Sequence, residues 1–164
     1  ELVTDEAGQS APRLGEVELT AEEARWFHGE LISDVVRMLC IGMIHGDLSE
    51  YNVLVAPFGP VIIDFPQVVS AAGNNAARDM LLRDVHNLRD SLGRFAPELL
   101  KTYFGEEMWA LYEKGELQAD TVLTGKFVFD EHTADLDAVM MSIEDARQEA
   151  IIRQQGREAA AEHD

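Results

Sequence analysis

The feature that most constrains this chain is a dense group of polar residues between two apolar runs. The segment 44–55, IHGDLSEYNVLV, places His45, Asp47, Glu50 and Asn52 within eight positions. Short apolar runs are typical of buried strands or helices, and polar groups beside them need hydrogen-bond partners or a chemical task. The segment is therefore either a polar loop between a helix and a strand or a catalytic loop.

Two β-branched runs around a turn follow this group. Residues 53–55 and 61–63 flank the sequence PFGP, a pattern that predicts a β-hairpin. Asp47 and Asn52 stand at its start and Asp64 at its end, and a hairpin brings its two ends together. We therefore expect Asp47, Asn52 and Asp64 to converge on one small volume. Converging oxygen ligands without cysteine or paired histidines suit a hard cation, Mg²⁺ or Mn²⁺.

The rest of the chain is predicted to be mostly helical. Thr20 and Glu23 form a capping box before an apolar stripe at helical spacing, and Gly42 is expected to end that helix. A second stripe predicts a helix over about 81–92, and Pro97 suits the first turn of a helix that continues through ELLKTYF. The fold class predicted for these 164 residues is mainly α with a short β-hairpin.

Charge and cysteine content exclude several classes of protein. The net charge of -18 argues against direct DNA binding and against association with anionic membranes. The sequence has no apolar stretch of transmembrane length and no recognisable secretory signal. Its single cysteine, Cys40, lies in an apolar helical run, suits a reducing compartment and is expected in the core. We expect a cytoplasmic protein.

The polar group and the hairpin together resemble a known pattern. H-x-D-x-x-x-x-N, followed by an apolar run and D-F, resembles the catalytic and metal loops of protein-kinase-like phosphotransferases. HGDLSEYNVLV and VIIDFPQVV are similar, more specifically, to the RIO family of atypical serine protein kinases. LLRDVHNLRDSLGRF, EEMWALYEKGEL and LTGKF extend the resemblance to about residues 1–127. It implies a hinge-like segment at 1–15 and the C-terminal lobe of a protein-kinase-like fold at 16–127.

The resemblance implies a role for several residues. Asp47 would be the catalytic base and Asn52 a metal ligand. Asp64 would be the metal-binding aspartate, which in RIO proteins can itself take up phosphate. Glu1 and Val3 would offer backbone groups to the adenine of ATP at the hinge.

Four further residues are candidates around the loop. His45 is expected to be a structural imidazole that pins the loop to the segment around Asp64. Asp84 is either a surface acid or, as the resemblance suggests, a carboxylate that turns inward to accept backbone N–H groups near His45 and Gly46. Ser49 stands where ordinary protein kinases carry a lysine. Glu50 is either a solvated acid or a group that helps to bind metal or substrate.

The chain also lacks parts that a complete kinase needs. It contains no G-x-G-x-x-G sequence, and its lysines all follow Asp64. Together with its start at Glu1, this predicts a fragment that begins at the hinge, lacks its N-terminal lobe and is inactive alone. The segment 128–164 is expected to be a helical extension whose end frays or is disordered.

The expected function is that of a RIO-type phosphotransferase in the complete protein. It would use ATP as co-substrate and Mg²⁺ or Mn²⁺ as cofactor, as a serine/threonine protein kinase or as an ATPase with autophosphorylation. Its partners would be a protein substrate or the protein itself, and the family suggests a link to ribosome assembly. Two alternatives stay open: a small-molecule kinase of the aminoglycoside or choline phosphotransferase type, and a non-catalytic assembly or interaction module.

Overall fold

The computed structural model describes residues 3–65, 69–71, 76–129, 139, 141–143, 146–148 and 150. The chain divides into two units, Glu1–Phe127 and Val128–Asp164. In the second unit the described residues from Val139 onward are helical, whereas Val128 and Phe129 are not. The predictions for Glu1 and for the end of the 128–164 extension fall outside the described residues. No described helix is long and apolar enough to cross a membrane.

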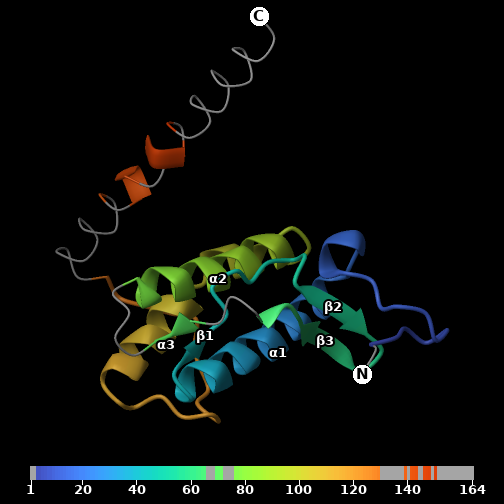
Figure 1. The fold of residues 1–164 in the computed structure, drawn as a ribbon, viewed down its shortest axis with the longest axis horizontal. Coiled ribbons are helices and arrows are strands. Elements are labelled where there is room, and N and C mark those ends of the chain that lie inside the picture. Colours follow the sequence, from blue (N-terminus) through green and yellow to red (C-terminus); the bar gives the residue numbers. More distant parts are fainter. Residues whose placement is uncertain are drawn as a thin grey trace, which may run out of the picture. The chain divides into compact units, whose positions relative to one another are not determined.

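The first unit consists of helices around two small antiparallel sheets (Figure 1). In chain order, its elements are η1 (Leu14–Glu16), α1 (Ala21–Cys40), β1 (Met43–Ile44), β2 (Val53–Ala56), β3 (Gly59–Ile62), β4 (Val69–Ser70), α2 (Ala77–Leu92), η3 (Pro97–Lys101) and α3 (Phe104–Glu113). This order confirms a mainly helical chain with one short β-hairpin. It differs from the prediction after Pro97, where a five-residue 3₁₀ helix replaces the longer helix through Phe104.

Helix α1 begins and ends where its sequence predicts. Thr20 Oγ1 accepts a hydrogen bond from Glu23 N at 3.1 Å, and Glu23 Oε2 accepts one from Thr20 N at 2.8 Å. Gly42 follows the helix in the left-handed region, with φ 76°. Cys40, in the last turn, is exposed, so its prediction as a core residue is wrong. Leu39 instead turns its side chain into the core.

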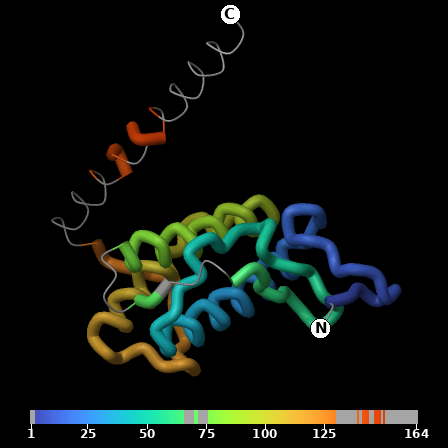
Figure 2. The backbone as a smooth tube through the Cα atoms, viewed as in Figure 1, coloured from blue at the N-terminus to red at the C-terminus, as the bar shows by residue number. Residues whose placement is uncertain are grey.

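The β2–β3 hairpin is shorter in its turn than predicted. Ala56 pairs with Gly59, so the strands continue through half of the PFGP sequence. Val55 lies opposite Pro60, but its N–H donates to Pro12 O at 2.8 Å. Pro60 therefore needs no N–H for that pairing. The same bond lays the N-terminal segment beside the hairpin (Figure 2).

One hydrophobic core joins the three α-helices to both sheets. Helix α2 packs against both α1 and α3, and β1 packs against α1. The largest fully buried apolar side chains are Leu14, Leu31, Leu39, Ile44, Leu48, Leu81, Leu88, Leu92 and Met108. Leu48 belongs to the loop between β1 and β2, so this loop is anchored in the core.

Candidate active site

Residues 45–52 form the loop between β1 and β2, and they present one acid at the surface. Gly46 and Leu48 are buried, whereas Asp47 between them is exposed. Gly46 has a φ of 85°, a left-handed conformation that glycine adopts without steric cost. Burial of the residues on both sides therefore holds the carboxylate of Asp47 outward.

His45 joins this loop to the end of the hairpin. Its Nε2–H donates to Ile63 O at 2.9 Å, and its Nδ1 accepts from Asp47 N at 3.3 Å. The imidazole is buried and packs against the ring of Phe65, with centroids 5.4 Å apart. The contact predicted for His45, with the segment around Asp64, is present. Its two bonds fix the ring as the Nε2–H tautomer.

Asn52 bonds to the loop at Asp47 and to the strand end before Asp64. Its amide Nδ2 donates to Asp47 O, and its backbone oxygen accepts from Ile63 N at 2.9 Å. Asp64 follows directly and is exposed. Its φ of 61° is the only positive one among the described non-glycine residues. Such a conformation costs energy and is frequent at functional sites. These bonds thus link Asp47 and Asn52 to Ile63, the residue before Asp64.

The atoms that remain at Asn52 and Asp64 fit a magnesium ion. Because Nδ2 of Asn52 is engaged with Asp47, Oδ1 is the amide atom available to a metal. Asp64 adds an exposed carboxylate. Two side-chain oxygens suit Mg²⁺ when substrate phosphates and waters complete its octahedron. Within the described residues, no group of three or more His, Cys, Asp or Glu could hold a metal ion by itself.

Asp84 turns inward from α2 and holds the loop. Its Oδ2 accepts from Gly46 N at 2.8 Å and its Oδ1 from Leu48 N at 2.9 Å. The residue is 1% exposed, so the surface-acid alternative is wrong. Burial raises the pKa of Asp84. The two backbone hydrogen bonds, from Gly46 and Leu48, and the charge of Arg83 oppose this rise.

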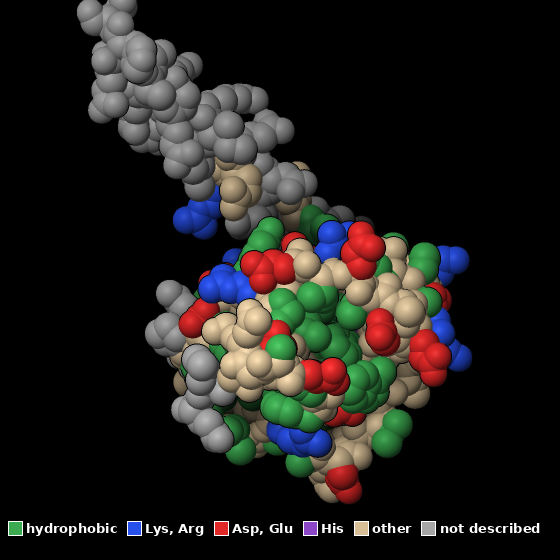
Figure 3. Space-filling model, turned by 90° about the vertical axis from the view of Figure 1, so that its right-hand side faces the viewer, with side chains coloured by type: hydrophobic (Ala, Val, Ile, Leu, Met, Phe, Trp, Pro, Cys, Tyr) green, Lys and Arg blue, Asp and Glu red, His purple; other side chains and the backbone are tan. Residues whose placement is uncertain are grey.

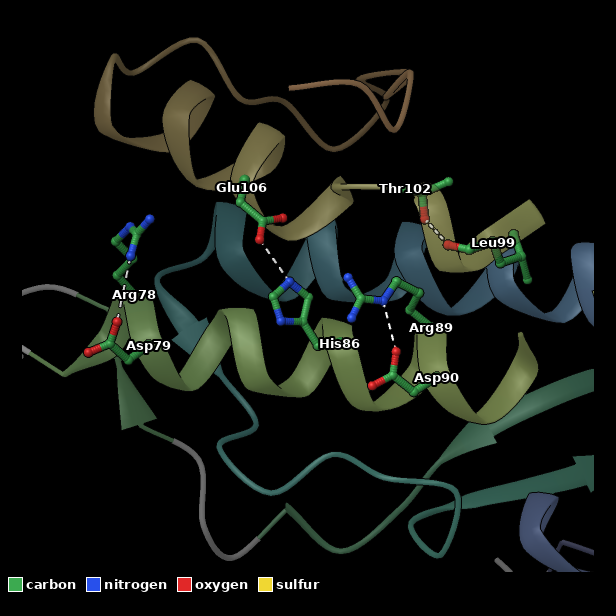
Figure 4. Close-up of polar contacts among 8 residues, drawn as sticks. All are labelled: Arg78, Asp79, His86, Arg89, Asp90, Leu99, Thr102 and Glu106. Carbon is green, nitrogen blue, oxygen red and sulfur yellow. Dashed lines mark hydrogen bonds and ion pairs between the residues drawn. The ribbon is translucent and has the colours of Figure 1, made fainter. Parts of the chain in front are cut away.

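Two further residues of α2 contact the loop, and neither was predicted from the sequence. Arg83 donates from a guanidinium nitrogen to Gly46 O at 3.0 Å, and Asn87 Nδ2 donates to Leu48 O at 3.0 Å. The signal was available, because residues four apart share a helix face and flank Asp84. His86, two residues from Asp84, points to the other side, where it meets Glu106 of α3 at 2.7 Å (Figure 4).

Ser49 and Glu50 make local and tertiary contacts. Ser49 Oγ accepts from Tyr51 N at 3.3 Å, which shapes the loop. Glu50 Oε2 accepts from Ser91 Oγ at 2.8 Å and from Arg94 at 2.9 Å. Glu50 therefore ties the loop to the end of α2. Its part in metal or substrate binding stays a prediction.

The predicted hinge residues lie at the edge of the described chain. Glu1 is outside the described residues. The carbonyl of Val3 accepts from Ala11 N at 3.0 Å, and Thr4 pairs with Ser10, so this segment folds back on itself. The roles of Glu1 and Val3 toward adenine stay predictions.

Comparison with known proteins finds relatives that are named as RIO-type serine/threonine-protein kinases. The serine/threonine-protein kinase RIO1 of Chaetomium thermophilum is 36% identical over 95 residues, which are 53% of this chain and 18% of that protein. The RIO-type serine/threonine-protein kinase Rio2 of Methanocaldococcus jannaschii is 39% identical over 83 residues, 49% of this chain and 30% of that protein. The chain thus spans less than a third of the length of either relative.

A solved structure and a family model were also matched. The structure is the Rio2 kinase–ADP/Mg²⁺–phosphoaspartate complex from Chaetomium thermophilum, with a TM-score of 0.49 and 26% identity. The match covers 90% of this chain and 43% of that one. The family model describes the RIO domain and matches residues 1–103, more than half of the sequence. This chain belongs to the RIO domain family.

Proposed function

We propose that this chain forms the catalytic and metal-binding half of an ATP-dependent, RIO-type phosphotransferase. One observation carries the proposal. The loop that exposes Asp47 is bonded through His45 and Asn52 to Ile63, the residue before Asp64. Relatives named serine/threonine-protein kinases support transfer to a protein hydroxyl. Autophosphorylation or ATP hydrolysis would use the same groups. Family membership favours this function over a small-molecule kinase of the aminoglycoside or choline type.

In this mechanism Asp47 is the catalytic base. Its exposed carboxylate accepts the hydrogen bond of the acceptor hydroxyl and holds the oxygen in line with the γ-phosphorus. The acceptor oxygen forms a bond to phosphorus, the bond from phosphorus to the β–γ bridging oxygen breaks, and ADP leaves. The proton of the hydroxyl passes to Asp47. With water as acceptor, the same step gives ATP hydrolysis.

Asn52 and Asp64 would hold the divalent metal in the proposed site. Magnesium, when bound there, neutralises charge on the phosphates. The buried bonds of Asp84 keep the loop rigid, so Asp47 needs little reorganisation when the acceptor arrives.

The second wall of the nucleotide site would come from another lobe of the complete protein. The end of the unit that carries the hairpin shows hydrophobic side chains with acidic and basic ones around them (Figure 3). Phe58, at the hairpin turn, is 75% exposed. A contiguous exposed apolar patch is typical of a contact surface. We propose that this end faces the other lobe.

The test is turnover by the complete protein with Mg²⁺-ATP. Asp47→Ala should lower kcat by about 10²-fold or more, because the base acts in the transition state. The Kd for Mg²⁺-ATP should change less than about threefold, since Asp47 is not among the proposed nucleotide or metal ligands. Asp79→Asn, at an exposed ion pair of α2, is the control. Full activity of Asp47→Ala would refute the base assignment. No turnover by the wild-type protein would instead favour a non-catalytic assembly module.

A further inference from the structure

We propose that Arg83 and Asn87 of α2 are positioning residues for Asp47. This role rests on the proposed function. Neither residue reaches the acceptor hydroxyl in this mechanism. Both act through the loop backbone, by fixing the carbonyl groups of Gly46 and Leu48.

The proposal follows from the peptide groups on each side of Asp47. In the preceding group, Gly46 O is held by Arg83 and Asp47 N by His45 Nδ1. In the following group, Asp47 O is held by Asn52 and Leu48 N by Asp84. Each of these two groups is therefore bonded at both ends. A change in the rotation of either one would swing the Asp47 carboxylate away from the acceptor.

The carbonyl of the next peptide group along the chain is also held by a side chain. Leu48 O accepts from Asn87 Nδ2. The carboxylate of Asp84 can only accept hydrogen bonds, so it cannot bind the carbonyls of Gly46 and Leu48. These carbonyls need other donors. Arg83 and Asn87 supply these donors from the same helix. Three side chains of α2 thus bind the N–H and C=O groups of both residues that flank Asp47.

Gly46 makes such support necessary. A glycine at φ 85° has no Cβ, so its neighbouring peptide groups turn more freely than those of other residues. Arg83 restrains the carbonyl side of this glycine with a charged donor, and such bonds are stronger than neutral ones.

The exposure of Arg83 and Asn87 separates positioning from general support of the fold. Both residues are exposed, whereas Leu81, Val85 and Leu88 make the core contacts of the helix. Loss of either donor should therefore loosen the loop and leave the packing of α2 in place. A displacement of about 1 Å at a catalytic group can lower the rate by up to about a hundredfold.

The experiment uses Arg83→Met, which keeps the apolar stem, and Asn87→Asp, which keeps the shape but removes the donor. Arg83→Lys restores a charged donor. Arg37→Met on α1 is the control, because Arg37 is exposed and pairs with Asp34 of the same helix. In the complete protein, kcat of Arg83→Met and Asn87→Asp should fall at least about tenfold with KM for Mg²⁺-ATP within about twofold. Arg83→Lys should recover most of the loss.

Amide hydrogen exchange supplies a second readout that does not depend on activity. Exchange in 45–52 should accelerate in Arg83→Met and Asn87→Asp, with α1 and the melting temperature close to those of Arg37→Met. Unchanged exchange in the loop, or faster exchange with unchanged kcat, would overturn the proposal. An equal fall in the protection of α1 would also overturn it, because the effect would then be on the fold. A wild-type protein without turnover would fail the proposed function itself, and the positioning role with it.

Discussion

The ring of His28 in α1 packs against the ring of Phe104 in α3, with centroids 5.1 Å apart and planes inclined by 58°. His28 is 3% exposed, and its Nε2 has no hydrogen-bond partner within the described part of the chain. Burial lowers the pKa of His28 to about 4, from an ordinary value of 6.5. The imidazole is therefore neutral in the folded protein at neutral pH.

We predict that stability falls as the pH drops from about 6.5 toward 4. In this interval the unfolded chain binds a proton on His28 and the folded chain does not, so protonation favours unfolding. The two pKa values correspond to a loss of about 3 kcal/mol. Urea unfolding between pH 7 and pH 4.5 measures most of this loss, and the pH dependence of His28→Leu should be smaller by about 2 kcal/mol. An equal pH dependence of the two proteins would contradict the prediction.

The inward carboxylate of Asp84 gives a second prediction. Asp84→Ala leaves the N–H groups of Gly46 and Leu48 buried without their acceptor. We expect the free energy of unfolding to fall by about 2 kcal/mol or more, measured by urea denaturation at pH 7. Asp90→Ala, at an exposed ion pair of the same helix, should stay within about 0.5 kcal/mol of the wild type. Equal midpoints for Asp84→Ala and Asp90→Ala would show that the buried bonds contribute little.

The features that could be predicted from the sequence depend on few neighbours. The capping box of Thr20 and Glu23 depends on residues within one helical turn. The helix end at Gly42 likewise depends on its immediate neighbours. The hairpin follows from its two β-branched runs. Its exact turn could not be predicted, because Pro60 lies opposite Val55, whose N–H donates to Pro12, far away in the sequence.

At the candidate site, the polar segment itself predicted the contact of His45, and the resemblance predicted that of Asp84. Helical spacing placed Arg83 on the helix face that reaches the loop, but the bonding partners of Arg83 and Glu50 went unpredicted. Each bond joins side chain and partner across about 40 residues of sequence, after α2 has packed on the loop. Cys40 was misplaced because a helical stripe does not show where, in its last turn, a helix leaves the core.

Gly125 gives a third prediction, on the packing of Phe104. Its φ is 75°, and a Cβ there would lie 2.8 Å from Phe104 Cζ. The backbone has little room to shift, because Gly125 N donates to Glu107 and Gly125 O accepts from Tyr103 N. Gly115, with a φ of 71° and nothing within 4 Å of its Cβ position, is a matched control.

We expect Gly115→Ala to cost about 1 kcal/mol from backbone strain alone. Gly125→Ala should cost about 1–3 kcal/mol more, because overpacking is added to the same strain. Thermal unfolding of the two variants measures the difference. Equal losses would mean that Phe104 moves aside freely, and that its contact with His28 is not rigid.

The last prediction concerns nucleotide binding by this 164-residue chain alone. Asn52 and Asp64 offer two side-chain oxygens, whereas Mg²⁺ takes six ligands and depends here on substrate phosphates. The net charge of -18 repels the nucleotide, and the lysines all follow Asp64 in the sequence. We therefore expect weak binding of Mg²⁺-ATP and negligible phosphate transfer by the chain. The complete protein should bind tightly enough for Asp64→Asn to weaken its affinity measurably. Titration calorimetry and phosphate release on both proteins test this, and comparable turnover by the two would show that a second lobe is dispensable.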